Sequence, residues 1–225
     1  MDRSAIFFTL RVAIVIAATV YVGRQVKKPT RWVGRLIARL MNRSHAPLTD
    51  WALNHLEVSK DAAVLDVGCG GGRTIERLAG MAASAYGIDY SAGSVAASSA
   101  HNKRLVEQGR VVVKRASVSQ LPFAGNSFEL VIAVETQYYW PDVANDMREI
   151  LRVLKPAGRL MVVAESYRGG RHDWYLGPVM RLLGSQRLSV EDHRALFEAA
   201  GYTQIEIFEQ RSKGWLCAAG QKPPL

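Results

Sequence analysis

Cysteine is scarce in this chain of 225 residues, which holds only Cys69 and Cys217. Two cysteines cannot form the disulfide framework of a small secreted domain, so we expect a reducing compartment. The sequence also lacks any group of Cys and His at metal-ligand spacing, and it therefore predicts no metal site. The length is that of one domain with additional segments.

Acidic residues are scarce in the first 50 positions, where nine Lys and Arg stand against only Asp2 and Asp50. Nine minus two gives +7 of the formal net charge of +9. The rest of the chain is close to neutral, which argues against a nucleic-acid groove across its surface. We expect no nucleic-acid partner, and the sequence leaves the oligomeric state open.

Charged side chains are also nearly absent from residues 5–22, where Arg11 is the only one. A helix over this segment is about 27 Å long, just short of the roughly 30 Å hydrocarbon core of a bilayer. We expect residues 1–24 to form a hydrophobic anchor; a cleaved signal peptide and a buried core helix are the alternatives. The basic residues that follow would keep the rest of the chain on the cytoplasmic side of the membrane.

Residues 25–48 form a second N-terminal segment, in which arginine recurs at Arg31, Arg35, Arg39 and Arg43. This spacing puts the arginines in one stripe of a helix, while apolar residues fill another arc. A basic amphipathic helix suits an anionic membrane surface; the alternative is an accessory helix that covers a pocket of the following domain. We therefore expect membrane association through residues 1–43.

Residues 64–72 read Val-Leu-Asp-Val-Gly-Cys-Gly-Gly-Gly, which is typical of a buried parallel strand that turns into a helix at a nucleotide site. Glycines let the backbone approach a ligand and adopt positive φ. The dinucleotide fingerprint G-x-G-x-x-G is incomplete, because Arg73 stands in place of its third glycine. Asp66 precedes the first glycine, and a carboxylate there would repel a pyrophosphate and attract a cationic ligand.

This stretch resembles motif I (D-x-G-x-G-x-G) of the class I S-adenosylmethionine-dependent methyltransferases. Residues 85–89 predict a short strand that ends in Asp89, about 20 residues past the glycine turn, where an acidic side chain meets ribose hydroxyls. The alternative is that Asp89 only caps the next helix. The family usually carries Gly-Asp-Ala shortly before a Leu-Pro-Phe segment, which this chain has at residues 121–123. This chain has Ser117 at the Asp position. We therefore expect weaker cofactor affinity, because a hydroxyl accepts a hydrogen bond without the charge of a carboxylate.

The resemblance implies S-adenosyl-L-methionine as the cofactor. Carried over position by position, it implies these cofactor-binding residues: Asp66, Gly68, Cys69, Gly70, Gly72, Asp89, Tyr90, Ser117, Val118 and Glu135.

The resemblance extends over about residues 49–220. Further strands are predicted at residues 111–116, 127–134 and 159–164, helices at 74–79 and 146–154, and a terminal helix, strand and strand at 189–200, 203–208 and 215–219. Alternating strands and helices indicate an α/β fold. We expect a methyltransferase domain over residues 49–225, with a Rossmann-like seven-stranded, mostly parallel sheet, a C-terminal antiparallel hairpin and helices on both faces.

Methyl transfer needs mainly alignment and exclusion of water, so no catalytic motif is required. The catalytic candidates are Glu135, Tyr139 and His172, on the loops after the fourth and fifth strands. The same loops carry Tyr138, Trp140, Glu165, Tyr167, Trp174 and Tyr175, and His45 precedes the first core helix. For the aromatic residues, ordinary packing is the alternative. We expect His55, His101 and His193 on helix surfaces and a substrate lid at residues 168–188.

The sequence thus predicts a membrane-anchored methyltransferase that acts on a small, lipophilic acceptor. One alternative is a membrane scaffold of methyltransferase fold that binds the cofactor without catalysis. Another is a nicotinamide-dependent reductase, which is disfavoured by Asp66, by Arg73 and by the lack of any Tyr-x-x-x-Lys pair.

Overall fold

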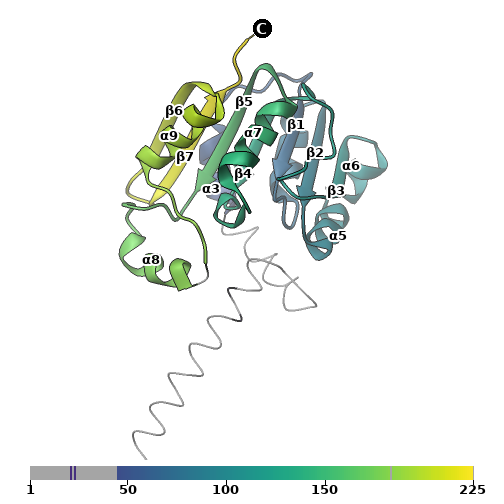
Figure 1. Ribbon diagram of the computed structural model, residues 1–225. Coiled ribbons are helices and arrows are strands. Elements are labelled where there is room, and N and C mark those ends of the chain that lie inside the picture. The colour runs from purple at the N-terminus through teal and green to yellow at the C-terminus, as the bar shows by residue number, and fades with distance from the viewer. Residues whose placement is uncertain (1–20, 22, 24–44, 183, 225) are drawn as a thin grey trace, which may run out of the picture.

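The computed structural model describes residues 21, 23, 45–182 and 184–224 (Figure 1). The predicted anchor (1–24) and most of the predicted basic helix (25–48) therefore lie outside the described residues. Within the described part of the chain, no helix is both long and apolar enough to cross a bilayer.

A single twisted sheet of seven strands forms the middle layer of the domain (Figure 1). Its strands lie in the order β3-β2-β1-β4-β5-β7-β6; the first five are parallel, and β7 and β6 run antiparallel to their neighbours. Their bounds are β1 (Ala63–Val67), β2 (Ser84–Asp89), β3 (Val111–Arg115), β4 (Phe128–Val134), β5 (Leu154–Ala164), β6 (Thr203–Gln210) and β7 (Trp215–Gln221). The predicted fold class, with its terminal antiparallel hairpin, is confirmed.

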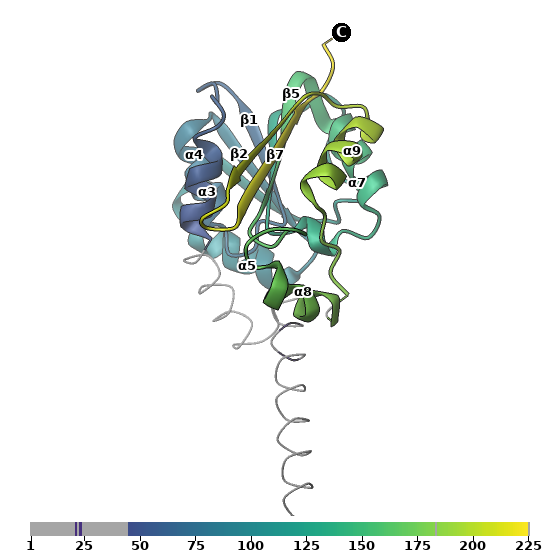
Figure 2. The same ribbon diagram turned by 90° about the vertical axis from the view of Figure 1, so that its left-hand side faces the viewer.

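Helices cover both faces of the sheet (Figure 2). One face carries α3 (Ala46–Leu53), α4 (Arg73–Met81) and α5 (Ala92–His101), with the short α6 (Lys103–Glu107) beside β3; the other carries α7 (Val143–Val153) and α9 (Val190–Ala200). The helix α8 (Asp173–Leu182) lies apart from both layers, beyond one end of the sheet (Figure 1).

Alternating apolar residues of the strands build two cores, one on each face. In β1, Leu65 and Val67 pack with α7 and α9, while Val64 packs with α3 and α4. This two-sided burial explains why the strands read as nearly continuous apolar runs, as parallel strands covered on both faces do.

Element boundaries differ from the sequence prediction at the turn before β5. The strand begins at Leu154, which pairs with Phe128, so residues 155–158, which lie between the predicted helix and the predicted strand, form an irregularity inside β5. Ala157 adopts φ 62 there, and Gly158 lies so close to the carbonyls of Lys155 and Phe128 that a Cβ would clash. The helix before it starts earlier than predicted, because the Asp142 carboxylate caps it by accepting from the Asn145 N–H.

The chain order creates a switch point between β1 and β4. Strands β1, β2 and β3 extend the sheet in one direction, and β4 and β5 then extend it in the other. Ligands of open α/β sheets bind in the crevice at the carboxyl ends of the strands at such a point. The fold therefore places the candidate site where the segments after β1, β2 and β4 meet.

Candidate functional site

A cavity of about 330 Å³ opens at the switch point. Nine of the predicted site residues line it together: Gly68, Cys69, Gly70, Asp89, Tyr90, Ser117, Val118, Glu135 and Tyr139. They come from the segments that follow β1, β2, β3 and β4, and so the sheet edge brings together residues that are far apart in the sequence.

The glycine turn after β1 is shaped by three left-handed residues, Gly68, Gly70 and Gly72, with φ of 80, 49 and 85. Gly68 also passes close to Thr136: a Cβ on it would lie 2.4 Å from the Thr136 Cγ2 atom. The Gly68 and Cys69 N–H groups both donate to the Ile88 carbonyl, at 2.8 and 2.9 Å. The turn is therefore held against β2, with Gly70 and Gly71 facing the cavity.

Asp89, at the end of β2, contributes a carboxylate to the cavity lining beside the glycine turn. Its Oδ2 accepts from the Gly70 N–H at 3.1 Å and its Oδ1 from the Ser91 N–H at 2.8 Å. Burial raises the pKa of Asp89, although these hydrogen bonds oppose the shift. The cap of α5 is supplied by the Ser91 hydroxyl, which accepts from the Ser94 N–H, so Asp89 is not needed for that role.

Asp66 is placed differently from the sequence interpretation. It is 2% exposed, does not line the cavity, and its Oδ2 has no hydrogen-bond partner. Burial, with the nearby Asp89 charge, raises its pKa to about 8, so Asp66 is largely protonated at neutral pH. The negative charge expected from Asp66 at the glycine turn must come from Asp89 instead.

Gly72 also lies outside the cavity lining. A Cβ on it would meet the Ser98 Oγ at 2.5 Å and the Asn102 Nδ2 at 2.6 Å, and the Asn102 amide donates to the Gly72 carbonyl at 2.9 Å. Gly72, the last glycine of motif I, therefore permits close packing of the turn against α5.

Ser117 and Val118 follow β3 and line the cavity beside Ala116. The Ser117 hydroxyl is exposed and accepts from the Ser119 N–H at 3.2 Å, which closes a local turn. Val118 is 6% exposed and belongs to the core on the α7 face. The side chain at position 117 can thus face a ligand while its neighbour fixes the loop.

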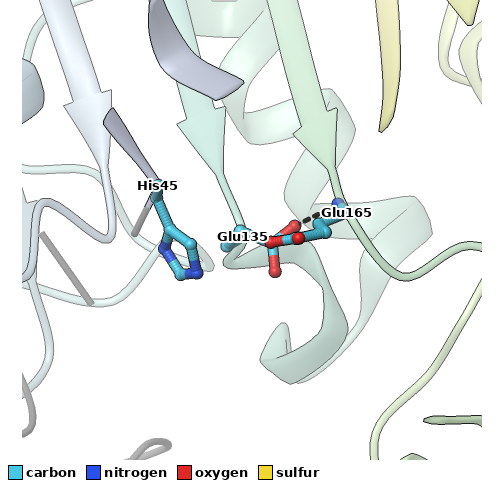
Figure 3. A group of neighbouring side chains, drawn as sticks. All are labelled: His45, Glu135 and Glu165. Carbon is cyan, nitrogen blue, oxygen red and sulfur yellow. Dashed lines mark hydrogen bonds between the residues drawn. The ribbon is translucent and has the colours of Figure 1, made fainter. Parts of the chain in front are cut away.

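Glu135 follows β4 in a left-handed conformation, with φ 58, and its carboxylate meets Glu165 and His45 (Figure 3). Its Oε1 accepts from the Tyr138 hydroxyl at 2.9 Å and from the Glu165 N–H. Burial raises the pKa of Glu135 to about 7, and the Glu165 charge adds to the shift. Burial lowers the pKa of His45, so this imidazole is neutral at pH 7.

The structure does not bring His172 to the cavity. Its ring lies against the turn between β6 and β7, where a Cβ on Gly214 would meet the His172 Nδ1 at 3.0 Å. Of the other candidates after β5, Tyr167 is buried and donates to Glu209 at 2.7 Å, and Trp174 and Tyr175 are exposed on α8. Trp140 lines the cavity, whereas Tyr138 reaches it only through Glu135.

The prediction that His193 lies on a helix surface is wrong. It is 1% exposed in α9; its Nδ1 lies 2.7 Å from the Ser189 carbonyl and its Nε2 3.1 Å from the Gln137 amide. His55 is half-buried and stacks on Phe208, and only His101 is exposed as expected. A helical period cannot reveal a polar partner such as Gln137 that comes from another segment.

Residues 168–188, the predicted lid, form a loop whose two ends meet. The Arg168 N–H donates to the Leu188 carbonyl at 2.9 Å, and Arg187 pairs with Asp173. The Gln186 N–H donates to the Tyr138 carbonyl at 3.1 Å, which ties the loop to the segment after β4. That the loop closes over a substrate remains a prediction.

Some of the site could not be read from the sequence. Thr136 packs on Gly68 and donates to the Val67 carbonyl at 3.0 Å, and Arg73, Thr74 and Arg77 of α4 line the cavity. Nothing in the pattern distinguishes these residues from ordinary helix and loop positions. The grouping of His45 with Glu135 and Glu165 is equally hidden, because the three residues belong to segments far apart in the chain.

Comparison with known proteins identifies the domain. Residues 65–162 match the methyltransferase domain family. The methyltransferase GfsG of Streptomyces halstedii is 30% identical over 167 residues, which are 71% of this chain and 59% of GfsG. The chain therefore covers less than two thirds of the length of this relative.

Solved structures show the same fold. A putative methyltransferase in complex with the Trm112 activator of Haloferax volcanii superposes with a TM-score of 0.71 at 21% identity, over 83% of this chain and 93% of that one. Geranyl diphosphate C-methyltransferase of Streptomyces coelicolor A3(2) was solved with S-adenosyl-L-homocysteine. It superposes with a TM-score of 0.68 at 14% identity, over 80% of this chain and 77% of that one.

Proposed function

This chain belongs to the class I S-adenosylmethionine-dependent methyltransferases, and on that premise we propose that it transfers the methyl group of S-adenosylmethionine to a small, lipophilic acceptor. The observation that carries the proposal is the cavity at the switch point, where the glycine turn and Asp89 converge.

The residues around the cavity fit this cofactor. Asp89 presents a carboxylate that can accept from two ribose hydroxyls, which are charge-assisted hydrogen bonds. Gly70 and Gly71 leave space for close approach of a ligand, and Ser117 offers a hydroxyl to an adenine amino group. A Cβ on Gly70 would meet nothing nearer than the Gly68 carbonyl at 3.9 Å, so the turn is open on that side.

When bound, the cofactor supplies an electrophilic methyl group on a sulfonium sulfur. Residues of this chain then have to align an acceptor and exclude water. Tyr139 and Trp140 line the cavity after β4 and can hold a flat acceptor. Glu135, whose pKa near 7 makes it a proton acceptor at neutral pH, lies beside them and can take a proton from a hydroxyl or thiol.

A lipophilic acceptor is favoured by the outer surface of α8. Trp174 is 81% and Leu182 61% exposed, and Tyr175 and Val179 are exposed beside them. At about 100° per residue these four side chains share an arc of about 140°. An exposed apolar face of this kind is typical of contact with a membrane or another protein. With the predicted anchor in residues 1–24, it supports a methyltransferase that works at a membrane and takes its acceptor from it.

The test uses the full-length protein in detergent. Calorimetric titration with S-adenosylmethionine should show saturable binding, and NADPH should not bind. Quinols, phenols, thiols and lipid headgroups are then screened for release of S-adenosylhomocysteine. Binding without turnover of any acceptor would favour the cofactor-binding scaffold, and binding of NADPH alone would overturn the proposal.

A further inference from the structure

We propose that His45, Glu135 and Glu165 form a binding site for one divalent transition-metal ion, such as Zn²⁺ or Mn²⁺, at the edge of the cavity that His45 and Glu135 line. The ligand atoms that the three side chains offer all lie within 4.8 Å of one another. Bound ligands at metal distances of about 2.1 Å lie about 3–4 Å apart, so small side-chain rotations are sufficient.

The three residues are held by separate, well-anchored elements (Figure 3). Glu135 and Glu165 follow the neighbouring parallel strands β4 and β5, whose carboxyl ends meet at the same edge of the sheet. His45 immediately precedes α3, where its carbonyl accepts from the Thr49 hydroxyl at 3.0 Å and from the Thr49 N–H at 2.9 Å. Three ligands on three fixed segments form a partly preorganised site.

One ligand is oriented by a group outside the trio. The buried Tyr138 hydroxyl donates to the Glu135 Oε1 at 2.9 Å, and the same hydroxyl accepts from the Ser166 N–H at 3.1 Å. This chain of hydrogen bonds fixes the Glu135 carboxylate and leaves its Oε2 without a hydrogen bond within the described part of the chain. A donor that bonds a metal-binding carboxylate without touching the ion orients that carboxylate.

The acidic members of the trio also repel each other. Two carboxylates lie side by side, and among the ion pairs of the described residues neither has a Lys or Arg partner. A cation between them would remove this repulsion. The imidazole favours an ion that accepts nitrogen, such as Zn²⁺, over Ca²⁺ and Mg²⁺, while the two carboxylates also suit Mn²⁺.

His45 and Glu135 line the same cavity as Asp89, so an ion held by them would have open coordination positions facing the space for the acceptor. An oxygen or sulfur atom of the acceptor could occupy such a position, which would restrict acceptors to hydroxyl, thiol or carboxylate compounds. This role, unlike metal binding itself, rests on the proposed methyltransferase function, and with a metal ion bound Glu135 acts as a ligand rather than as the proton acceptor.

The test titrates untagged, chelator-stripped, full-length protein with Mn²⁺, and the free ion is followed by electron paramagnetic resonance. One Mn²⁺ should bind per chain and be displaced by Zn²⁺, which binds such ligands more tightly. His45→Asn and Glu165→Gln should each weaken binding by about 10-fold or more, and Tyr138→Phe by about 10-fold. His55→Asn and Glu57→Gln, from the same region of the chain, serve as matched controls and should bind Mn²⁺ normally.

A spectroscopic readout separates ligation from a structural effect. The ¹⁴N coupling of the bound Mn²⁺ should be present in the unaltered protein and absent in His45→Asn, while thermal unfolding confirms that each variant is folded. No binding of Mn²⁺ or Zn²⁺, or binding that all three variants leave unchanged, overturns the proposal. Titration of the same samples with S-adenosylmethionine distinguishes failure of the metal site from failure of the proposed function. If S-adenosylmethionine binds and no metal ion does, only the metal site is refuted.

Discussion

At the scale of single residues, the charge facing the cavity is carried by Asp89 rather than by Asp66. Both are buried, but Asp89 lines the cavity and accepts two backbone N–H bonds, whereas Asp66 has an unpartnered oxygen and a pKa of about 8. A group that is mostly neutral at pH 7 contributes little attraction to a cationic ligand. The carboxylate that a ligand meets at the glycine turn is therefore that of Asp89.

Asp89→Asn should weaken binding of S-adenosylmethionine by about 1.5–3 kcal/mol, because hydrogen bonds from a ligand to a charged group contribute about that much. Calorimetric titration measures the change. The matched control is Asp61→Asn, an exposed acid outside the cavity, which should leave the affinity unchanged. Equal affinity of Asp89→Asn and the unaltered protein would remove Asp89 from the site.

Asp66 predicts a pH dependence of stability. Its folded pKa of about 8 lies above the ordinary value of 3.8 for an aspartate side chain, so the folded protein keeps a proton that the unfolded chain releases between these two values. Stability therefore falls as the pH rises from about 4 to about 8. Asp66→Asn removes this loss and should raise the free energy of unfolding by about 2 kcal/mol or more at pH 8, and hardly at pH 4.

Urea unfolding of both proteins at several pH values measures this difference. If the gain from Asp66→Asn does not grow as the pH rises, then Asp66 is ionised in the folded protein and the burial argument fails.

Ser117→Asp should tighten cofactor binding by about 1 kcal/mol if position 117 faces the adenine, because a carboxylate accepts an amino-group hydrogen bond more strongly than a hydroxyl does. The substitution can keep the local turn, since Asp can also accept from the Ser119 N–H. Titration of Gln120→Asp, three residues along the chain, exposed and outside the cavity lining, is the control. An unchanged affinity would show that Ser117 does not contact the base.

At the scale of elements, the sequence predicted the strands, the helix order and the terminal hairpin, because the strands are long apolar runs and the turns carry glycine or capping residues. It misplaced the start of β5, since pairing of Leu154 with Phe128 depends on a neighbouring strand rather than on local pattern. Most of the predicted cofactor-binding residues, which follow predicted strands, do line the cavity. The His45, Glu135 and Glu165 grouping and the burial of His193 depend on tertiary contacts, which no local pattern encodes.

The exposed face of α8 predicts contact with lipid. Trp174→Ser combined with Leu182→Ser should lower binding to vesicles of phosphatidylcholine and phosphatidylglycerol by about 10-fold or more, since burying one large apolar side chain contributes about 1.5–3 kcal/mol. Flotation with the vesicles measures the bound fraction. Val106→Ser, which removes an exposed apolar side chain from α6, is the matched control. Equal flotation of all three proteins would mean that α8 does not touch the membrane.

At the scale of the whole molecule, the charge is divided between two regions with different proposed tasks. Residues 1–50 carry +7 of the net +9, while the domain that holds the cavity is nearly neutral. A neutral domain gains little from an anionic membrane by itself, so its attachment has to come from the N-terminal segment and from the apolar face of α8. The two contributions are separable because α8 and residues 1–24 are different segments of the chain and can be altered independently.

Deleting residues 1–24 should therefore move most of the protein from the membrane fraction to the supernatant after high-speed centrifugation of a lysate. A helix over residues 5–22 would bury about 18 mostly apolar residues, far more than the four side chains of α8 can.

The truncated protein should still bind S-adenosylmethionine, which would show that the loss of attachment is not a loss of folding. Combining the deletion with Trp174→Ser and Leu182→Ser should abolish the remaining vesicle binding. If the truncated and full-length proteins fractionate alike, the segment is not an anchor, and the acceptor need not come from a membrane.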